Sequence, residues 1–189
     1  MSRRVSSVRI VGGKFKGLKI PYRASSDVRP TSNKNRETLF NWLINDIEGA
    51  TCLDMFAGTG ALGIEAISRG ANFVYFCEKK GRMCSKIKKT VDRLNIHCQT
   101  DIININSLDF FFQHKIKEPL DIIFLDPPFR KNFIGKALKE IEKQGLVSKG
   151  SILFVEIEKE KEIEELFINW DLVKSKIGGQ TRYSLFRCK

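Results

Sequence analysis

The sequence is poor in the residues that nucleophilic, metal-dependent or disulfide chemistry requires. Its 189 residues include two histidines, His97 and His114, and neither has neighbours that would complete a catalytic or metal-binding set. The five cysteines form no C-x-x-C pair, and an odd number makes a poor disulfide framework. We therefore expect no metal and a reducing, cytoplasmic environment, with Cys52 and Cys77 as buried thiols in strand-like apolar runs.

Long apolar runs are missing as well. No segment approaches the roughly 20 apolar residues of a transmembrane helix, and no signal-peptide core is visible near the N-terminus. Positive charge, in contrast, is abundant: the net charge is +11, and residues 1–37 hold ten basic and two acidic residues. A basic arm on a nearly balanced body predicts a polyanionic partner. Since the arm has no amphipathic helical period, nucleic acid is favoured over a membrane surface. The predicted nucleic-acid contacts are Arg3, Arg4, Arg9, Lys14, Lys16 and Arg29.

From residue 51 onward, apolar strand-like runs alternate with helical patterns. Strands are expected at 51–56, 73–77, 101–106, 120–125 and 150–156, and helices at 60–69, 80–95, 107–115, 132–144 and 159–168. Two last strands, 170–177 and 183–188, are expected to form a hairpin across Gly178-Gly179. Because alternating strands and helices imply crossover connections, this pattern predicts an α/β fold with a doubly wound, mostly parallel Rossmann-like sheet of seven strands. The last two strands add an antiparallel hairpin at the C-terminal end.

Two further elements precede this sheet. Residues 8–21 read as two short strands around Gly12-Gly13, which predicts a β-hairpin. A helix capped by Thr31 or Ser32 is expected to run through Ile44. Its buried face would consist of Leu39, Phe40, Leu43 and Ile47. We therefore expect a small basic β-hairpin arm, residues 1–30, that contacts nucleic acid, followed by one α/β domain, residues 31–189.

A glycine-rich segment follows the first strand of the α/β domain. Gly58-Thr59-Gly60-Ala61-Leu62-Gly63 matches G-x-G-x-x-G, and Glu78 lies 20 residues after Gly58, at the end of the next strand. A carboxylate there accepts hydrogen bonds from ribose hydroxyls, in dinucleotide and in S-adenosylmethionine sites alike. Asp54, at the end of the first strand, favours S-adenosylmethionine, because a carboxylate repels a pyrophosphate and attracts an ammonium or a sulfonium.

The most specific signal is Asp126-Pro127-Pro128-Phe129, directly after a buried strand. An amino group on a purine ring is conjugated with the ring and is therefore a poor nucleophile. The Asp126 carboxylate and the Pro127 carbonyl could accept its two N–H bonds and so favour a more nucleophilic nitrogen, while two prolines hold these acceptors in place. Phe129 offers a face for stacking an extruded base. The segment predicts methyl transfer onto an exocyclic nitrogen of a nucleobase.

Together these motifs resemble the class I S-adenosylmethionine-dependent methyltransferases of the RsmD type, the bacterial small-subunit (16S) rRNA guanine-N2 methyltransferases. The other matching segments are Arg9–Gly13 with Gly17, Arg29-Pro30-Thr31, Arg36–Leu43, Leu53–Ala66, Gly179-Gln180-Thr181 and Tyr183. The resemblance covers nearly the whole chain in order. It implies S-adenosylmethionine as cofactor and small-subunit rRNA, or the assembling small subunit, as partner. We expect a monomer.

The resemblance also implies roles for the matched residues. Asp126, Pro127, Pro128 and Phe129 would hold the target amino group. The predicted cofactor-binding residues are Thr31, Arg36, Asp54, Phe56, Gly58, Gly60, Glu78, Asn106, Ser107 and Asp126. Among these, Thr31 and Arg36 would close over the cofactor or the RNA, and Asn106-Ser107 would lie near the adenine. Lys79-Lys80-Gly81-Arg82 is more basic than the family pattern predicts.

Three alternatives remain open from the sequence. An adenine-N6 methyltransferase shares the Asp-Pro-Pro-Phe motif, although the chain has no large second region for reading DNA base edges. A dinucleotide-dependent oxidoreductase would use Gly58–Gly63 and leave Asp126–Phe129 unexplained. A ribosome-binding protein with a vestigial pocket would bind RNA without turnover.

Overall fold

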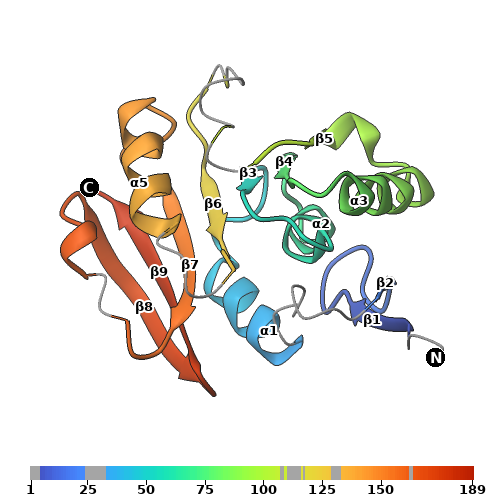
Figure 1. Cartoon of the computed structure of the whole chain (residues 1–189), viewed down its shortest axis with the longest axis horizontal. Coiled ribbons are helices and arrows are strands. Elements are labelled where there is room, and N and C mark those ends of the chain that lie inside the picture. Colours follow the sequence, from blue (N-terminus) through green and yellow to red (C-terminus); the bar gives the residue numbers. More distant parts are fainter. Residues whose placement is uncertain are drawn as a thin grey trace.

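A seven-stranded sheet forms the centre of the molecule, in the strand order β5-β4-β3-β6-β7-β9-β8, and β1 and β2 make a separate two-stranded sheet (Figure 1). The computed structural model describes residues 5–23, 33–106, 109, 116, 118–128, 133–161 and 164–189. The strands are β1 Val5–Arg9, β2 Lys19–Arg23, β3 Thr51–Asp54, β4 Phe73–Cys77, β5 Thr100–Ile103, β6 Ile122–Leu125, β7 Ile152–Glu158, β8 Trp170–Gly178 and β9 Thr181–Cys188. The helices are α1 Asn33–Trp42, α2 Ala61–Ser68, α3 Gly81–Leu94 and α5 Phe133–Lys143, with 3₁₀ turns η1 His97–Gln99 and η2 Glu164–Leu166.

The direction of the strands confirms the predicted doubly wound sheet. β3 pairs in parallel with both β4 and β6, β4 with β5, and β6 with β7. β9 is antiparallel to β7 and to β8, which is the expected C-terminal hairpin. The chain runs outward from β3 to β5, then returns to β6 on the other side of β3, so the strand order reverses between β3 and β6. In open α/β sheets, ligands bind at the carboxyl ends of the strands beside such a reversal.

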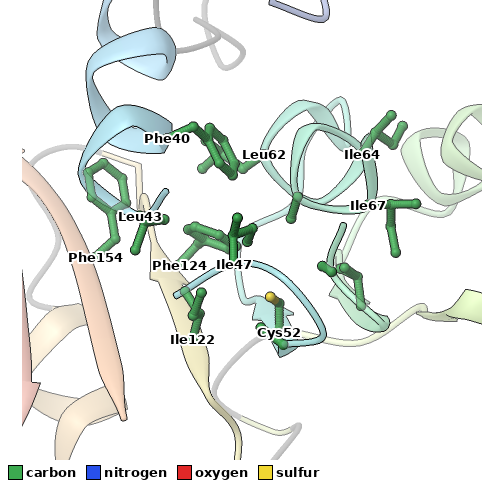
Figure 2. Close-up of a cluster of buried hydrophobic side chains, with 14 of the residues drawn as sticks. Phe40, Leu43, Ile47, Cys52, Leu62, Ile64, Ile67, Ile122, Phe124 and Phe154 are labelled. Atoms are coloured by element: carbon green, nitrogen blue, oxygen red, sulfur yellow. The ribbon is translucent and has the colours of Figure 1, made fainter. Parts of the chain in front are cut away.

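Helices cover both faces of the sheet because the central strands are apolar on both sides. Successive strand residues point to opposite faces, and accordingly Phe124 of β6 belongs to one buried cluster while Leu125 belongs to the other. Helices α1, α2 and α3 contribute to the first cluster and α5 to the second. In the first cluster, shown in Figure 2, the Phe40 ring of α1 lies 5.9 Å from that of Phe124, which lies 6.4 Å from that of Phe154.

Most of the predicted elements are present, with ends displaced by a few residues. The expected buried face of α1 is confirmed, since Leu39, Phe40, Leu43 and Ile47 are all buried. Cys52 and Cys77 are buried as well. The helix predicted over 107–115 falls mostly outside the described residues. None of the helices in the described ranges combines the length and apolar content needed to cross a bilayer.

The helix predicted over 159–168 is wrong. Residues 159–160 form a turn, and Glu164–Leu166 forms a single 3₁₀ turn. The residue that anchors this region is Phe167, which is buried with its ring stacked on that of Phe186 in β9 at 4.0 Å, shortly before the start of β8.

The hairpin predicted around Gly12-Gly13 exists, but these glycines do not form its turn. β1 and β2 are antiparallel with Arg9 opposite Lys19, and residues 10–18 form a longer loop between them. Gly13 has φ +71°, and a Cβ there would lie 1.7 Å from the carbonyl oxygen of Ser68 at the end of α2. The glycine pair therefore allows the loop to approach α2 closely.

Candidate active site

The turn between β3 and α2 lies at the carboxyl edge of the sheet, and its glycines expose the backbone there. The Ala57 amide donates to the Cys77 carbonyl at the end of β4 (3.0 Å), and the Gly60 amide donates to the Ala57 carbonyl (2.7 Å). Gly58 and Gly60 have φ values of +52° and +76°, which favour glycine. A Cβ on Gly58 would have Phe56 O, 3.8 Å away, as its nearest non-adjacent atom, so the space above this backbone is open to a ligand.

Glu78 holds this turn from the neighbouring strand. Its carboxylate accepts hydrogen bonds from the amides of Gly58 (2.9 Å) and Lys80 (2.7 Å). The Glu78 backbone is fixed in turn, because its carbonyl accepts from Asn104 Nδ2 (2.9 Å) and from the Ile105 amide (3.2 Å). The structure thus places the Glu78 carboxylate beside Gly58 of the glycine-rich turn.

Asp54 is the most perturbed acid of this edge. The carboxylate is buried and accepts a hydrogen bond from the Gly63 amide (3.1 Å) in the first turn of α2. The pKa of Asp54 is raised to about 7, first by burial and then by the charges of Asp126 and Glu78, against the lowering effect of the Gly63 amide. Three carboxylates from β3, β4 and β6 therefore face one small region, which favours a cationic ligand.

The Asp126-Pro127-Pro128 segment leaves β6 beside this carboxylate group. Asp126 is half-buried, Pro127 is buried and Pro128 is exposed. The Asp126 charge acts on Asp54 on one side and on the Tyr183 hydroxyl of β9 on the other. The pKa of Tyr183 is raised mainly by burial, and the Asp126 charge adds to this effect. The turn after β6 thus lies between the glycine-rich turn and the C-terminal hairpin.

The other expected cofactor residues differ in position. Phe56 is half-buried, and its ring lies 5.8 Å from that of Phe133 at the start of α5. Asn106 is exposed three residues after the end of β5. Thr31, Ser107 and Phe129, like Arg3, Arg4 and Arg29 of the arm, lie outside the described residues. Arg9, Lys14 and Lys16 are exposed on β1 and the following loop.

Arg36 does not lie open at the site but is buried beneath the N-terminal hairpin. Its guanidinium donates to the Arg9 carbonyl (2.6 Å) and forms an ion pair with Glu65 of α2 (3.4 Å), and both side chains are fully buried. Burial lowers the Arg36 pKa, while the Glu65 charge raises it. In this arrangement Arg36 holds the hairpin loop, α1 and α2 together, in place of the predicted closure over the cofactor or RNA.

The residues matched to known proteins cover this whole arrangement. The family model described as Conserved hypothetical protein 95 matches residues 8–187. Ribosomal RNA small subunit methyltransferase D of Buchnera aphidicola subsp. Acyrthosiphon pisum is 39% identical over 186 residues, which is 98% of this chain and 96% of the relative. The chain belongs to this methyltransferase family.

A sequence relative and a solved structure, both from Escherichia coli, agree with that placement. Ribosomal RNA small subunit methyltransferase D of strain K12 is 36% identical over 180 residues, which is 95% of this chain and 89% of that protein. The solved structure of yhhF, described as a methyltransferase, superposes with a TM-score of 0.89 at 34% identity and covers 97% of this chain and 99% of that one. The resemblance read from the motifs is confirmed, together with the class I methyltransferase fold and the enzyme class.

Within this methyltransferase D family member, two sets of interactions were missed from the sequence. Glu65 accepts hydrogen bonds from the Val11 amide (2.8 Å), the Gly12 amide (2.7 Å) and Arg69 Nε (3.0 Å), in addition to its ion pair with Arg36. The available signal was a lone acid in the otherwise apolar segment Ala61–Ile67, which is buried on all sides. The second set links the Tyr183 hydroxyl to the Asn35 amide of α1 and to Thr181 Oγ1 (3.1 Å).

Proposed function

We propose that the chain transfers the methyl group of S-adenosylmethionine to the exocyclic N2 of a guanine in small-subunit rRNA. The observation that carries this proposal is the position of Asp126-Pro127-Pro128 at the end of β6, next to Asp54 and the glycine-rich turn, where the strand order reverses. The chain's relatives are named as ribosomal RNA small subunit methyltransferases, which supports rRNA as the substrate class.

The residues at this edge fit such a cofactor. Glycines leave the backbone at 58–60 free for close approach, and Glu78 is positioned to receive ribose hydroxyls. The raised pKa of Asp54 reflects burial and like-charge crowding, which the ammonium and sulfonium of the cofactor would relieve. S-adenosylmethionine supplies an electrophilic methyl group on a sulfonium.

The proposed role of Asp126 and Pro127 is to orient the nucleophile. The carboxylate and the carbonyl accept the two N–H bonds of guanine N2, so that its lone pair points along the line of the methyl carbon–sulfur bond. N2 forms a bond to the methyl carbon as that carbon's bond to sulfur breaks, and neutral S-adenosylhomocysteine leaves. The surplus proton on N2 then passes to Asp126 or water.

We further propose that residues 1–30 act as an RNA-contacting arm and residues 31–189 as the methyltransferase domain. The exposed side chains of Arg9, Lys14 and Lys16 support a phosphate-binding role for the arm. We expect a monomeric enzyme, because one chain supplies the glycine-rich turn, the turn after β6 and the β1-β2 hairpin. We propose that it acts in the cytoplasm, where a ribosomal substrate would be found.

The direct test is mass spectrometry of nucleosides from small-subunit particles that lack the modification, after incubation with the protein and labelled S-adenosylmethionine. Label in N2-methylguanosine is expected. Label in N6-methyladenosine would keep the cofactor and overturn the target base. Cofactor binding without label in any nucleoside of RNA or DNA substrates would contradict the proposal and leave a binding protein.

A further inference from the structure

The solvent face of α3 carries a row of positive charges. This helix contains five basic residues and one acidic residue, and its buried side consists of Met83, Cys84, Ile87, Thr90 and Val91. Four of the basic residues, Arg82, Lys86, Lys89 and Arg93, recur at helical spacing and form one stripe about 16 Å long, since each helical residue rises about 1.5 Å. We call these four residues the α3 stripe.

Helix stability explains Arg93, which lies in the last turn, but not the other three residues of the stripe. Like charges three or four residues apart repel one another along a helix. Positive charges in a first turn are also unfavourable, because the helix dipole places positive potential there. The first turn of α3 nevertheless contains Arg82 and no acidic residue, and Lys79 and Lys80 precede it. Charges placed against the local electrostatics indicate a partner that compensates for them.

Both ends of the stripe lie next to parts of the proposed machinery. At its start, the Lys80 amide donates to Glu78 beside the glycine-rich turn. At its end, Arg93 Nη2 donates to the Lys19 carbonyl of β2 (3.2 Å), and Figure 1 shows α3 on the same side of the molecule as the β1-β2 hairpin. The stripe therefore connects the active-site edge with the exposed basic residues Arg9, Lys14, Lys16 and Lys19.

We propose that the α3 stripe is a second RNA-binding surface, which takes the phosphate backbone of the rRNA segment next to the target guanine. This inference rests on the proposed function and extends it, because it defines a track from the hairpin to the site. A membrane surface fits less well, since α3 exposes no large apolar side chain that could insert into lipid.

The test compares two triple variants with equal loss of charge. Arg82→Gln/Lys86→Gln/Lys89→Gln removes most of the stripe and leaves the Arg93 hydrogen bond. Lys136→Gln/Lys139→Gln/Lys143→Gln is the control, on the outer side of α5, whose buried side packs in the other core cluster. Glutamine has a helix propensity similar to that of lysine and arginine, so both variants are expected to fold.

Two readouts are needed, the affinity for small-subunit rRNA as a function of salt and the steady-state methylation of particles. The stripe variant should bind RNA at least tenfold more weakly, with a salt slope lower by about 0.7 to 0.9 for each lost phosphate contact. Its KM for particles should rise while kcat and calorimetric S-adenosylmethionine binding stay unchanged. The single variants Lys86→Gln and Lys89→Gln should each show part of the effect.

Equal RNA affinity and equal salt slope in the stripe and control variants would overturn this inference, even if the wild type methylates particles. A wild type that binds RNA through the stripe but transfers no methyl group to guanine N2 would instead contradict the proposed function alone. Thermal unfolding of each variant identifies any loss of affinity that comes from loss of fold.

Discussion

Burial of the Asp54 carboxylate destabilises the ligand-free fold, and its position at the carboxyl edge of the sheet suits a cationic ligand. Its pKa of about 7 lies above the ordinary value, so the folded protein binds a proton more tightly than the unfolded chain does. As pH rises from about 4 toward 7, the unfolded chain releases this proton first, and the stability of the ligand-free fold decreases.

Asp54→Asn should therefore stabilise the ligand-free protein above pH 7 by up to about 4 kcal/mol, since each pKa unit corresponds to about 1.4 kcal/mol. The gain in stability should shrink as pH falls toward 4, because the protonated Asp54 of the folded wild type is then neutral, as asparagine is. Asparagine also retains an oxygen that can accept from the Gly63 amide. Thermal unfolding of both proteins between pH 4 and 8 measures this. A difference that does not change with pH would show that Asp54 is ionised without penalty.

The same substitution should weaken S-adenosylmethionine binding at pH 8, because the attraction to the sulfonium and ammonium is lost. In the wild type, binding should weaken as pH falls below about 7 and Asp54 takes up its proton. Calorimetric titration at several pH values gives both results. Affinity that is independent of pH in the wild type would remove Asp54 from the cofactor site.

The close approach of Gly13 to α2 predicts how strongly the loop at 10–18 depends on this glycine. Gly13→Ala introduces a Cβ that would lie 1.7 Å from the Ser68 carbonyl oxygen, at a φ of +71°. Gly17→Ala is the matched control, because Gly17 has φ +90° and no atom within 4 Å of the added Cβ. We expect about 1 kcal/mol of destabilisation for the control, from backbone strain alone, and roughly 3 kcal/mol for Gly13→Ala. Equal losses in urea unfolding would mean that the loop moves off α2 without cost.

At the level of elements, the buried Arg36–Glu65 pair joins α1, α2 and the hairpin loop. Glu65→Gln leaves the Arg36 guanidinium buried without a counter-charge, which should cost roughly 3 to 5 kcal/mol of unfolding free energy. The double variant Arg36→Met/Glu65→Gln should recover part of this loss, because no fully buried charge is left unpaired and Arg69, the other partner of Glu65, is partly exposed. A double-mutant cycle in denaturant measures the coupling, and additive losses would contradict it.

The comparison with sequence-based expectation is also clearest for elements. The central strands and α1 were predictable because strands buried on both faces are continuous apolar runs, and because one helix face at 39–47 repeats with helical period. The region 159–168 misled because its charged residues suit many exposed conformations, while the contact that anchors its end, Phe167 on Phe186, is with a residue 19 positions further on. Gly12-Gly13 misled because a glycine pair suits a tight turn and equally a close approach to a distant helix.

The site was predictable only in part, for a similar reason. Asp54, Gly58, Glu78 and Asp126 lie at strand ends, and parallel strands bring their carboxyl ends to one edge. Apart from Arg69, four residues further on, the partners of Glu65 lie 29 to 54 positions away in the chain, so no local pattern reports them. The role expected for Arg36 came from the family resemblance, and a charged residue in a helix gives no sign in the sequence that a partner is buried with it.

For the whole molecule, β8 is one of the two edges of the sheet, and an uncovered edge strand offers backbone groups to another copy. β8 exposes Leu172, Val173 and Ile177, yet it also presents Lys174 and Lys176, and a bulge interrupts its pairing with β9 between Leu172 and Lys174. Charges and bulges protect edge strands from pairing with another copy. Lys174→Thr/Lys176→Thr should therefore increase self-association in analytical ultracentrifugation, whereas the wild type should sediment as a monomer. A wild-type dimer would overturn this reading of the edge.

The central claim is that the turn after β6 orients an amino group for methyl transfer beside the glycine-rich turn. The most direct measurement is the single-turnover rate of methyl transfer by Asp126→Ala, at saturating S-adenosylmethionine and particle concentrations, against Asp171→Ala on the exposed edge strand β8 as control. We predict a rate at least 100-fold lower for Asp126→Ala, as for loss of other preorganised groups that act on the transition state, and an unchanged rate for the control. An unchanged rate for Asp126→Ala would contradict the account.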